Sequence, residues 1–307
     1  MSVSPSDIPM MRIKGGSFLM GSDRHYPEEA PVRRADVGDY MIDITPVTNE
    51  SFARFVRETG HVTLAEIPPD PTDYPGMPPE RAIAGSLVFV PPPRPVALTQ
   101  PIWWHFIFGA NWRHPEGPNS NIDLRPTHPV VHISPGDAQA YADWAGKALP
   151  TECEWEYAAR GGLENAEFSW GDTREPDGRI MANTWQGNFP WNSTKPPEAF
   201  RTSPVGAFPA NGYGLHDMIG NVWEWTSDWF SLNTAEPRSG CCAPRARTAD
   251  ETESRGGGGT LRRVMKGGSH LCSPDYCQRY RPAARYPQPI DSPTSHIGFR
   301  CVKRLLT

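Results

Sequence analysis

The stretch LPTECEWEYAARGG, residues 149–162, carries the clearest secondary-structure signal of the chain. Thr151 is followed three residues later by Glu154, and this pair forms a capping box in which each side chain hydrogen-bonds the other residue's backbone N–H. Gly161 is a natural stop because glycine adopts a left-handed backbone without strain. The pattern predicts a short helix whose buried face consists of Trp155, Ala158 and Ala159.

Two more short helices are predicted on the same grounds. One begins near Asn49 and stops at Gly60. Its apolar face consists of Phe52, Phe55 and Val56. The other has Ser134 as its N-cap and ends at Gly146. Its buried stripe consists of Ala138, Tyr141, Ala142 and Ala145.

Proline and glycine divide the rest of the chain into short pieces. The 35 Pro and 28 Gly are spread over the whole length, which excludes long helices and long strands. The Pro-rich span from Glu66 to Pro101 is predicted to be an extended surface excursion, and Gly256 to Gly259 a flexible tract in a long loop. Neither has the composition of a domain linker, so we expect residues 1–307 to form a single α+β domain.

Composition and charge narrow the classes of function. The net charge is −5 with no basic stripe, which argues against nucleic-acid binding. No apolar run approaches the length of a membrane span, and the N-terminus lacks the apolar core of a signal peptide. We therefore expect a soluble, cytoplasmic protein with no membrane or nucleic-acid partner. In that compartment its six cysteines should be free, metal-binding or catalytic.

The densest chemical signal is GGSHLCSPDYC, residues 267–277. Cys272 and Cys277 are separated by a Ser-Pro-Asp turn sequence that could bring the two sulfurs together. A structural disulfide is disfavoured in a reducing compartment, and zinc would want four ligands. Cu(I), which accepts two or three soft sulfur ligands, fits best, although a reactive or inert thiol pair stays open.

A second polar cluster is DMIGNVWE, residues 217–224. Asp217 and Glu224 flank a turn that contains glycine, and hard oxygen ligands of this kind suit calcium. The alternative is that Glu224 forms an ion pair with an arginine.

The stretch KGGSHLCSPDYCQRYRPAAR, residues 266–285, resembles the catalytic segment of the formylglycine-generating enzymes, the sulfatase-modifying factor family. Much of the chain resembles the family in the same order. The matching stretches are GGSF (15–18), PVTN (46–49), HPVVH (128–132), LPTECEWEYAARGG (149–162), ANTWQGNFP (182–190), NGYGLHDMIGNVWEWTSDW (211–229) and GFRC (298–301). Inactive paralogues and iron-dependent sulfoxide synthases share much of this pattern, and the Cys-x4-Cys pair is its specific part.

The resemblance implies a C-type-lectin-like α+β fold and an aerobic, copper-dependent oxidoreductase. Cys272 and Cys277 would hold Cu(I), and O2 would be the co-substrate. The enzyme would oxidise a cysteine in a Cys-x-Pro-x-Arg segment of an unfolded or nascent sulfatase to Cα-formylglycine, activating the sulfatase. Ser269, Tyr276 and Trp223 match active-site positions, with loop hydrogen bonding and packing as their alternative roles.

The resemblance also implies calcium. One structural calcium ion would be bound by Asp217 and Glu224 with the carbonyls of Gly220 and Val222. Asn183 and Thr184 match the first half of a second calcium site. Its second half falls within residues 194–199, where Pro197 stands in the expected acidic position beside Glu198.

The remaining cysteines match no disulfide frame. Cys301 is expected to be reduced, because the position of its usual partner is Ala159. Cys241 and Cys242 are neighbours, for which a disulfide is strained, and we expect free thiols rather than a copper-loading pair. For these three and Cys153 the sequence does not fix the redox state. His296 stands where several relatives carry Asn.

Two other functions on this scaffold compete with the oxidase. An iron-dependent sulfoxide synthase would need a His-rich metal site, usually supplied by an extra N-terminal helical domain of which we see no sign. A non-catalytic peptide- or saccharide-binding module would have no need for the Cys272 and Cys277 pair.

Overall fold

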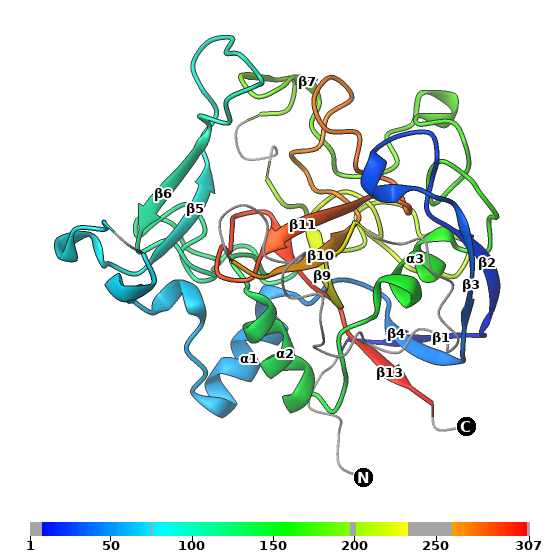
Figure 1. The fold of residues 1–307 in the computed structure, drawn as a ribbon, viewed down its shortest axis with the longest axis horizontal. Helices are drawn as coiled ribbons and strands as arrows, with labels where there is room; N and C mark the ends of the chain where they lie inside the picture. Colours follow the sequence, from blue (N-terminus) through cyan, green and yellow to red (C-terminus); the bar gives the residue numbers. More distant parts are fainter. Residues whose placement is uncertain (1–7, 75, 197–200, 233–259, 306–307) are drawn as a thin grey trace.

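The computed structural model describes residues 8–74, 76–196, 201–232 and 260–305. In this part of the chain, short helices and small sheets are joined by long loops (Figure 1). The predicted α+β class is confirmed. The stretches around Cys241, Gly256 and Glu198 lie outside the described residues.

A four-stranded sheet with the order β11-β10-β9-β12 forms the centre of the molecule. Its strands are β9 (Trp223–Trp229), β10 (Arg262–Lys266), β11 (Arg285–Pro289) and β12 (Ile297–Gly298). β10 is antiparallel to both β9 and β11, whereas β12 runs parallel to β9. The loop from β10 to β11 contains both Cys272 and Cys277, so the central sheet carries the predicted site.

A second sheet joins the two ends of the described chain. It consists of β1 (Met10–Ile13), β4 (Tyr40–Asp43) and β13 (Val302–Arg304), with β4 in the middle. Three hairpins complete the strands: β2 (Gly16–Met20) with β3 (Arg33–Val37), β5 (Gly85–Phe89) with β6 (Trp104–Phe108), and β7 (Gly187–Asn188) with β8 (Asn192–Ser193). In Figure 1 the β5–β6 hairpin lies far from β1 and β13.

The three predicted helices are confirmed as α1 (Asn49–Thr59), α2 (Pro135–Trp144) and α3 (Glu152–Arg160). The predicted capping box of Thr151 and Glu154 forms, and Ser134 caps α2 in a second such box with Asp137. The C-cap residues Gly60 and Gly161 adopt the expected left-handed backbone, with φ of 70° and 58°. Every residue predicted for the three apolar faces is buried. The chain also forms short 3-10 helices, η1 (Pro27–Glu29), η2 (Leu64–Glu66), η3 (Pro71–Asp73), η4 (Pro79–Arg81) and η5 (Pro176–Gly178).

The prediction for the Pro-rich span 66–101 was partly wrong. This span contains β5, whose alternating pattern buries Ser86 and Val88. The β5–β6 hairpin contributes to a small second core of Trp103, Trp185, Phe189 and Leu271. The prolines around β5 concealed a strand that gains its stability from a partner farther along the chain.

Candidate active site

The loop between β10 and β11 brings the two predicted thiols into contact. The sulfur atoms of Cys272 and Cys277 lie 3.3 Å apart, well beyond the ~2.05 Å of a disulfide bond, and both thiols are free. The amide of Cys277 donates to the carbonyl of Ser273 at 2.8 Å, which closes the turn. The Ser-Pro-Asp turn predicted from the sequence is therefore confirmed.

The two thiols differ in acidity and in exposure. Cys272 is buried with 2% of its surface exposed, and burial raises the pKa of its thiol well above the usual range. The hydrogen bond with Cys272 lowers the pKa of Cys277, and the Arg279 guanidinium lowers it further against the effect of burial. This arrangement favours a Cys277 thiolate that accepts the S–H of Cys272.

The cationic side chain of Arg279 lies beside Cys277, and an aromatic ring from the N-terminal region packs against it. The Arg279 guanidinium lies 3.6 Å from the ring centroid of Tyr26 and donates to Glu28 Oε1 at 2.6 Å. Glu28 belongs to η1, more than two hundred residues away in the sequence. Sequence reasoning missed these three residues, because no local pattern signals a contact between segments so far apart.

Ser269 supports the loop through its backbone and its hydroxyl. Its amide donates to Cys272 Sγ at 3.4 Å, and its Oγ accepts from the amide of Leu271 at 3.2 Å. The neighbouring Gly268 has φ of 70°, and a Cβ there would approach the carbonyl of Arg279 to 2.8 Å. A larger residue at position 268 would therefore push the two arms of the loop apart.

Tyr276 belongs to an aromatic wall next to the thiols. The residue is 40% exposed, and its ring stacks on Phe189 at 4.6 Å and meets Trp103 edge-on at 5.3 Å. Trp103 and Phe189, which sequence reasoning did not single out, come from different segments. Trp223 is only 4% exposed and packs 5.9 Å from the ring of Tyr286. Of the two predicted aromatic residues, Tyr276 is therefore the one that is exposed to solvent.

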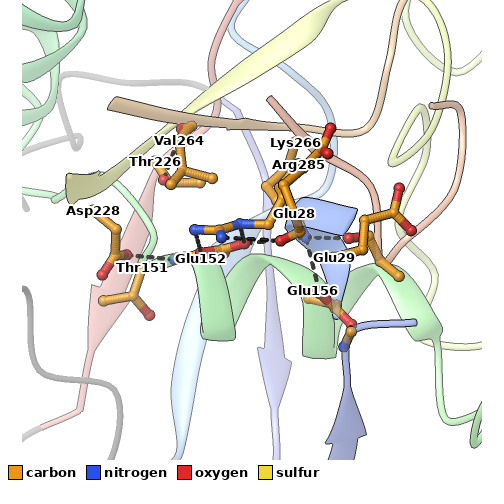
Figure 2. A network of polar contacts seen from close by, with 12 residues as sticks. Glu28, Glu29, Thr151, Glu152, Glu156, Thr226, Asp228, Val264, Lys266 and Arg285 are labelled. Carbon is orange, nitrogen blue, oxygen red and sulfur yellow. Dashed lines mark hydrogen bonds and ion pairs between the residues drawn. The ribbon is translucent and has the colours of Figure 1, made fainter. Parts of the chain in front are cut away.

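We call residues 267–284, between β10 and β11, the thiol loop. Two buried ion pairs hold the ends of the thiol loop on α3 (Figure 2). Lys266, the last residue of β10, donates to Glu156 at 2.9 Å, and Arg285, the first residue of β11, donates to both oxygens of Glu152 at 2.8 and 3.0 Å. Burial would raise the pKa of Glu156, but Lys266 and Arg160 overcome this and lower the pKa to about 2. Lys266 and Arg285 lie opposite each other in the β10–β11 pair, so α3 anchors both ends of the loop at the same position along the sheet.

The first predicted calcium site is partly occupied by an arginine. Arg300 donates to both carboxylate oxygens of Glu224, at 2.7 and 2.8 Å, and Trp155 adds a third hydrogen bond. The alternative that paired Glu224 with an arginine is what the structure shows. Asp217 is different: burial raises the pKa of its carboxyl, which accepts from the neutral amide of Gly206 at 2.7 Å. The positive charge of Arg300 acts on Asp217 as well and offsets part of this rise in pKa.

A lysine lies between the residues of the second predicted calcium site. Lys195 Nζ donates to Asn183 Oδ1 at 2.8 Å and to the carbonyl of Thr184 at 3.0 Å. Burial lowers the pKa of Lys195 to about 8, which leaves it charged at neutral pH. These two oxygens already accept hydrogen bonds from a cation of the chain, while the second half of the predicted site, at Pro197 and Glu198, lies outside the described residues. In the described part of the chain, no three His, Cys, Asp or Glu residues cluster as metal ligands.

The remaining sequence-predicted residues have structural surroundings. Cys301 is buried and free, as expected, and Cys153 lies at a partly exposed position of α3. His270, which follows Ser269 in the same loop, donates through Nδ1 to the carbonyl of Asn221 at 2.8 Å. Desolvation lowers the pKa of His296, whose ring lies 4.8 Å from the ring of Trp104. No helix of the described residues is long and apolar enough to cross a membrane.

Known proteins match this sequence over nearly the whole length of this chain. The family described as the sulfatase-modifying factor enzyme 1-like domain matches residues 4–305. The chain is 52% identical over 298 residues to the formylglycine-generating enzyme of Mycobacterium tuberculosis, covering 95% of this chain and 97% of that one. It is 44% identical over 310 residues to the formylglycine-generating enzyme of Thermomonospora curvata, covering 97% and 95%.

A solved structure agrees on the fold. PvdO from Pseudomonas aeruginosa superposes with a TM-score of 0.65 at 23% identity, covering 96% of this chain and 94% of that one. The predicted formylglycine-generating-enzyme-like fold is therefore confirmed. Together with the sequence matches, it shows that the chain belongs to the sulfatase-modifying factor family, the family of the formylglycine-generating enzymes.

Proposed function

We propose that this protein is a copper- and oxygen-dependent formylglycine-generating enzyme that oxidises a cysteine of a sulfatase Cys-x-Pro-x-Arg segment to Cα-formylglycine. The observation that carries the proposal is the contact between two reduced thiols, at 3.3 Å, beside an open aromatic face. An inactive relative or a binding module would not need this pair, and the family match gives the chemistry a context.

The donor set fits Cu(I). Cys272 and Cys277 are two soft sulfur ligands that approach each other without being bonded, and the more exposed Cys277 leaves one side open. When bound there, copper would supply the redox chemistry with O2 and would deprotonate a coordinating substrate thiol. The low pKa of the Cys277 thiol favours its thiolate, the form that binds metal.

The chain itself supplies binding and orientation. The exposed ring of Tyr276, stacked on Phe189, offers an apolar face against which a peptide can pack. The ion pairs of Lys266 and Arg285 with α3 keep the thiol loop in one conformation. An extended, unfolded substrate segment would lose conformational entropy on binding, and the proline of the motif lowers that cost.

The decisive test is mass spectrometry of a Cys-x-Pro-x-Arg peptide incubated with the protein, Cu(I) and O2. We expect the substrate side chain to change from CH2SH to CHO, with O2 as the two-electron oxidant, water as the source of the aldehyde oxygen and the sulfur released as sulfide. No change should occur when either copper or oxygen is withheld. Activity that follows iron instead would favour the sulfoxide-synthase alternative. No turnover and no copper affinity would favour a binding module.

Substrate selection tests the same proposal from the peptide side. Replacing the Pro or the Arg of the motif should reduce kcat/KM far more than replacing either x residue. Proline restricts the peptide to an extended shape, and arginine offers a planar donor fork that lysine cannot copy. Equal kcat/KM for all these peptides would show that the motif is not recognised.

We further propose that a structural calcium ion is bound at Asp217, with the carbonyls of Gly220 and Val222 as further ligands. The support is the buried Asp217 carboxyl, which accepts a hydrogen bond from the amide of Gly206 at 2.7 Å and whose pKa is raised by burial. Glu224 would share the cation only while keeping its two hydrogen bonds from Arg300.

A further inference from the structure

The β7–β8 hairpin returns along the segment that it follows in the chain, and Lys195 lies just beyond its end. The side chain reaches two oxygens of that segment, Asn183 Oδ1 at 2.8 Å and the Thr184 carbonyl at 3.0 Å. Asn183 is 2% exposed, so its side-chain oxygen has little access to solvent. Without the ammonium, a buried acceptor would lose its partner.

The oxygens held by Lys195 lie next to the residues that support the thiol loop. Trp185, directly after Thr184, donates its amide to the carbonyl of Cys272 at 2.9 Å. The backbone carbonyl of Asn183 accepts from the amide of Asn221 at 2.8 Å, and its side-chain amide donates to the carbonyl of Arg201 at 2.8 Å. The cation therefore sits at a junction of several loops.

We propose that the Lys195 ammonium is a built-in substitute for a metal ion, which joins the β8 end to Asn183 and Thr184 and makes this junction independent of calcium. The inference concerns the metal content and stability of the fold, and it does not depend on the proposed oxidase activity.

The chemistry of the two cations explains the choice. Calcium takes about six to eight oxygen ligands, several of them usually carboxylates, whereas an ammonium group has three donors and is satisfied by two or three neutral oxygens. The oxygens that Lys195 contacts are an amide and a peptide carbonyl. A divalent ion would have to displace the ammonium or lie beside it, and like charges in a partly buried site repel.

Calcium binding to the metal-free full chain tests the proposal directly. Equilibrium dialysis should give the same number of bound calcium ions for wild type and for Asn183→Ala, because no calcium depends on Asn183. Asp217→Asn, which removes the other candidate site, should bind none. One calcium ion lost in Asn183→Ala would overturn the proposal, and one retained in Asp217→Asn would do so if adding Asn183→Ala then removed it.

Thermal unfolding in the presence of a chelator tests the role of the ammonium itself. Lys195→Met keeps the length of the side chain but removes its charge, and we expect its Tm to fall by roughly 3–6 °C because a buried acceptor loses its donor. Lys303→Met, at an exposed position of β13, is the matched control and should leave Tm unchanged. Equal Tm values for wild type and Lys195→Met would contradict the proposal that the ammonium takes the place of a metal ion. If Lys195→Met fails to fold, the dialysis experiment decides.

Discussion

The thiol loop and the turn from Asp217 to Glu224 are both irregular and largely buried, yet their polar groups have different partners. In the thiol loop, the partner of Cys277 is Cys272, five residues away, and the pair keeps one partly exposed side. In the acidic turn, the partner of Glu224 is Arg300, from the far end of the chain, and both carboxylate oxygens are engaged. The pair of Cys272 and Cys277 therefore remains available to bind a ligand, whereas both carboxylate oxygens of Glu224 are already engaged by Arg300.

The largest expected effect lies in the thiol loop. Cys272→Ser and Cys277→Ser should each lose tight Cu(I) binding and lower turnover by at least about 100-fold, since loss of even an outer-shell partner of a metal typically costs 10–100-fold. Hydroxyl oxygen is a poor ligand for Cu(I), and the substitution barely changes the size of the side chain.

Cys153→Ser is the matched control, because Cys153 is a cysteine outside the thiol loop, at a partly exposed position of α3. It should keep both copper binding and turnover. X-ray absorption on the copper-loaded wild type should show two sulfur neighbours. Full activity in a metal-free preparation would contradict the claim that the two thiols act by binding copper, since the loop would then act through thiol redox chemistry alone.

The difference between local and distant partners also determines which parts of the structure could be predicted from the sequence. Caps such as Thr151 with Glu154, and the Ser-Pro-Asp turn, involve residues a few positions apart, and the structure confirms them. Contacts such as Arg279 with Glu28 join distant segments, and no local pattern reveals them. Lys195 lay within the span expected to contribute a metal ligand, but a search for acidic residues passes over a lysine.

The second prediction concerns the ion pairs beneath the thiol loop. Glu156→Gln leaves the fully buried Lys266 without its nearest carboxylate, and breaking a buried pair in this way typically costs about 3–5 kcal/mol of unfolding free energy. Urea unfolding at pH 7 measures this difference. Asp39→Asn, which breaks the exposed pair with Arg12, is the control and should have little effect.

The same variant predicts a pH dependence with a definite sign. The pKa of Glu156 is lowered to about 2 in the folded state from its ordinary value of 4.5. Its stabilising contribution is therefore fully present above about pH 4.5 and is lost as the pH falls toward 2. The difference in unfolding free energy between wild type and Glu156→Gln should shrink over that range, and a constant difference would show that the carboxylate is not the source of the stability.

The third prediction separates the two carboxylates of the acidic turn. Glu224→Gln should destabilise the protein with or without calcium, because it weakens the hydrogen bonds to the buried Arg300. Without calcium, Asp217→Asn should lower the Tm less than Glu224→Gln does. It should abolish the rise in Tm that added calcium gives the wild type through preferential binding to the folded state. Equal Tm values for the wild type with calcium and with a chelator would remove the proposed site.

The smallest expected effect concerns the aromatic wall, and it asks whether the open side of the thiol loop is a peptide surface. Tyr276→Phe keeps the ring that stacks on Phe189 and removes only the hydroxyl, so kcat/KM for the peptide should change by less than about 3-fold. Tyr276→Ala removes the ring face and should raise KM by roughly 5- to 20-fold, which corresponds to about 1–2 kcal/mol of lost aromatic packing. Copper affinity should stay unchanged in both variants, because neither touches a sulfur. Tyr74→Ala, at a similarly exposed tyrosine of the η3 region, is the control for a general effect of losing a surface ring. If Tyr276→Ala instead lowered copper affinity along with kcat, the ring would be a support of the thiol loop, and the peptide would have to bind elsewhere.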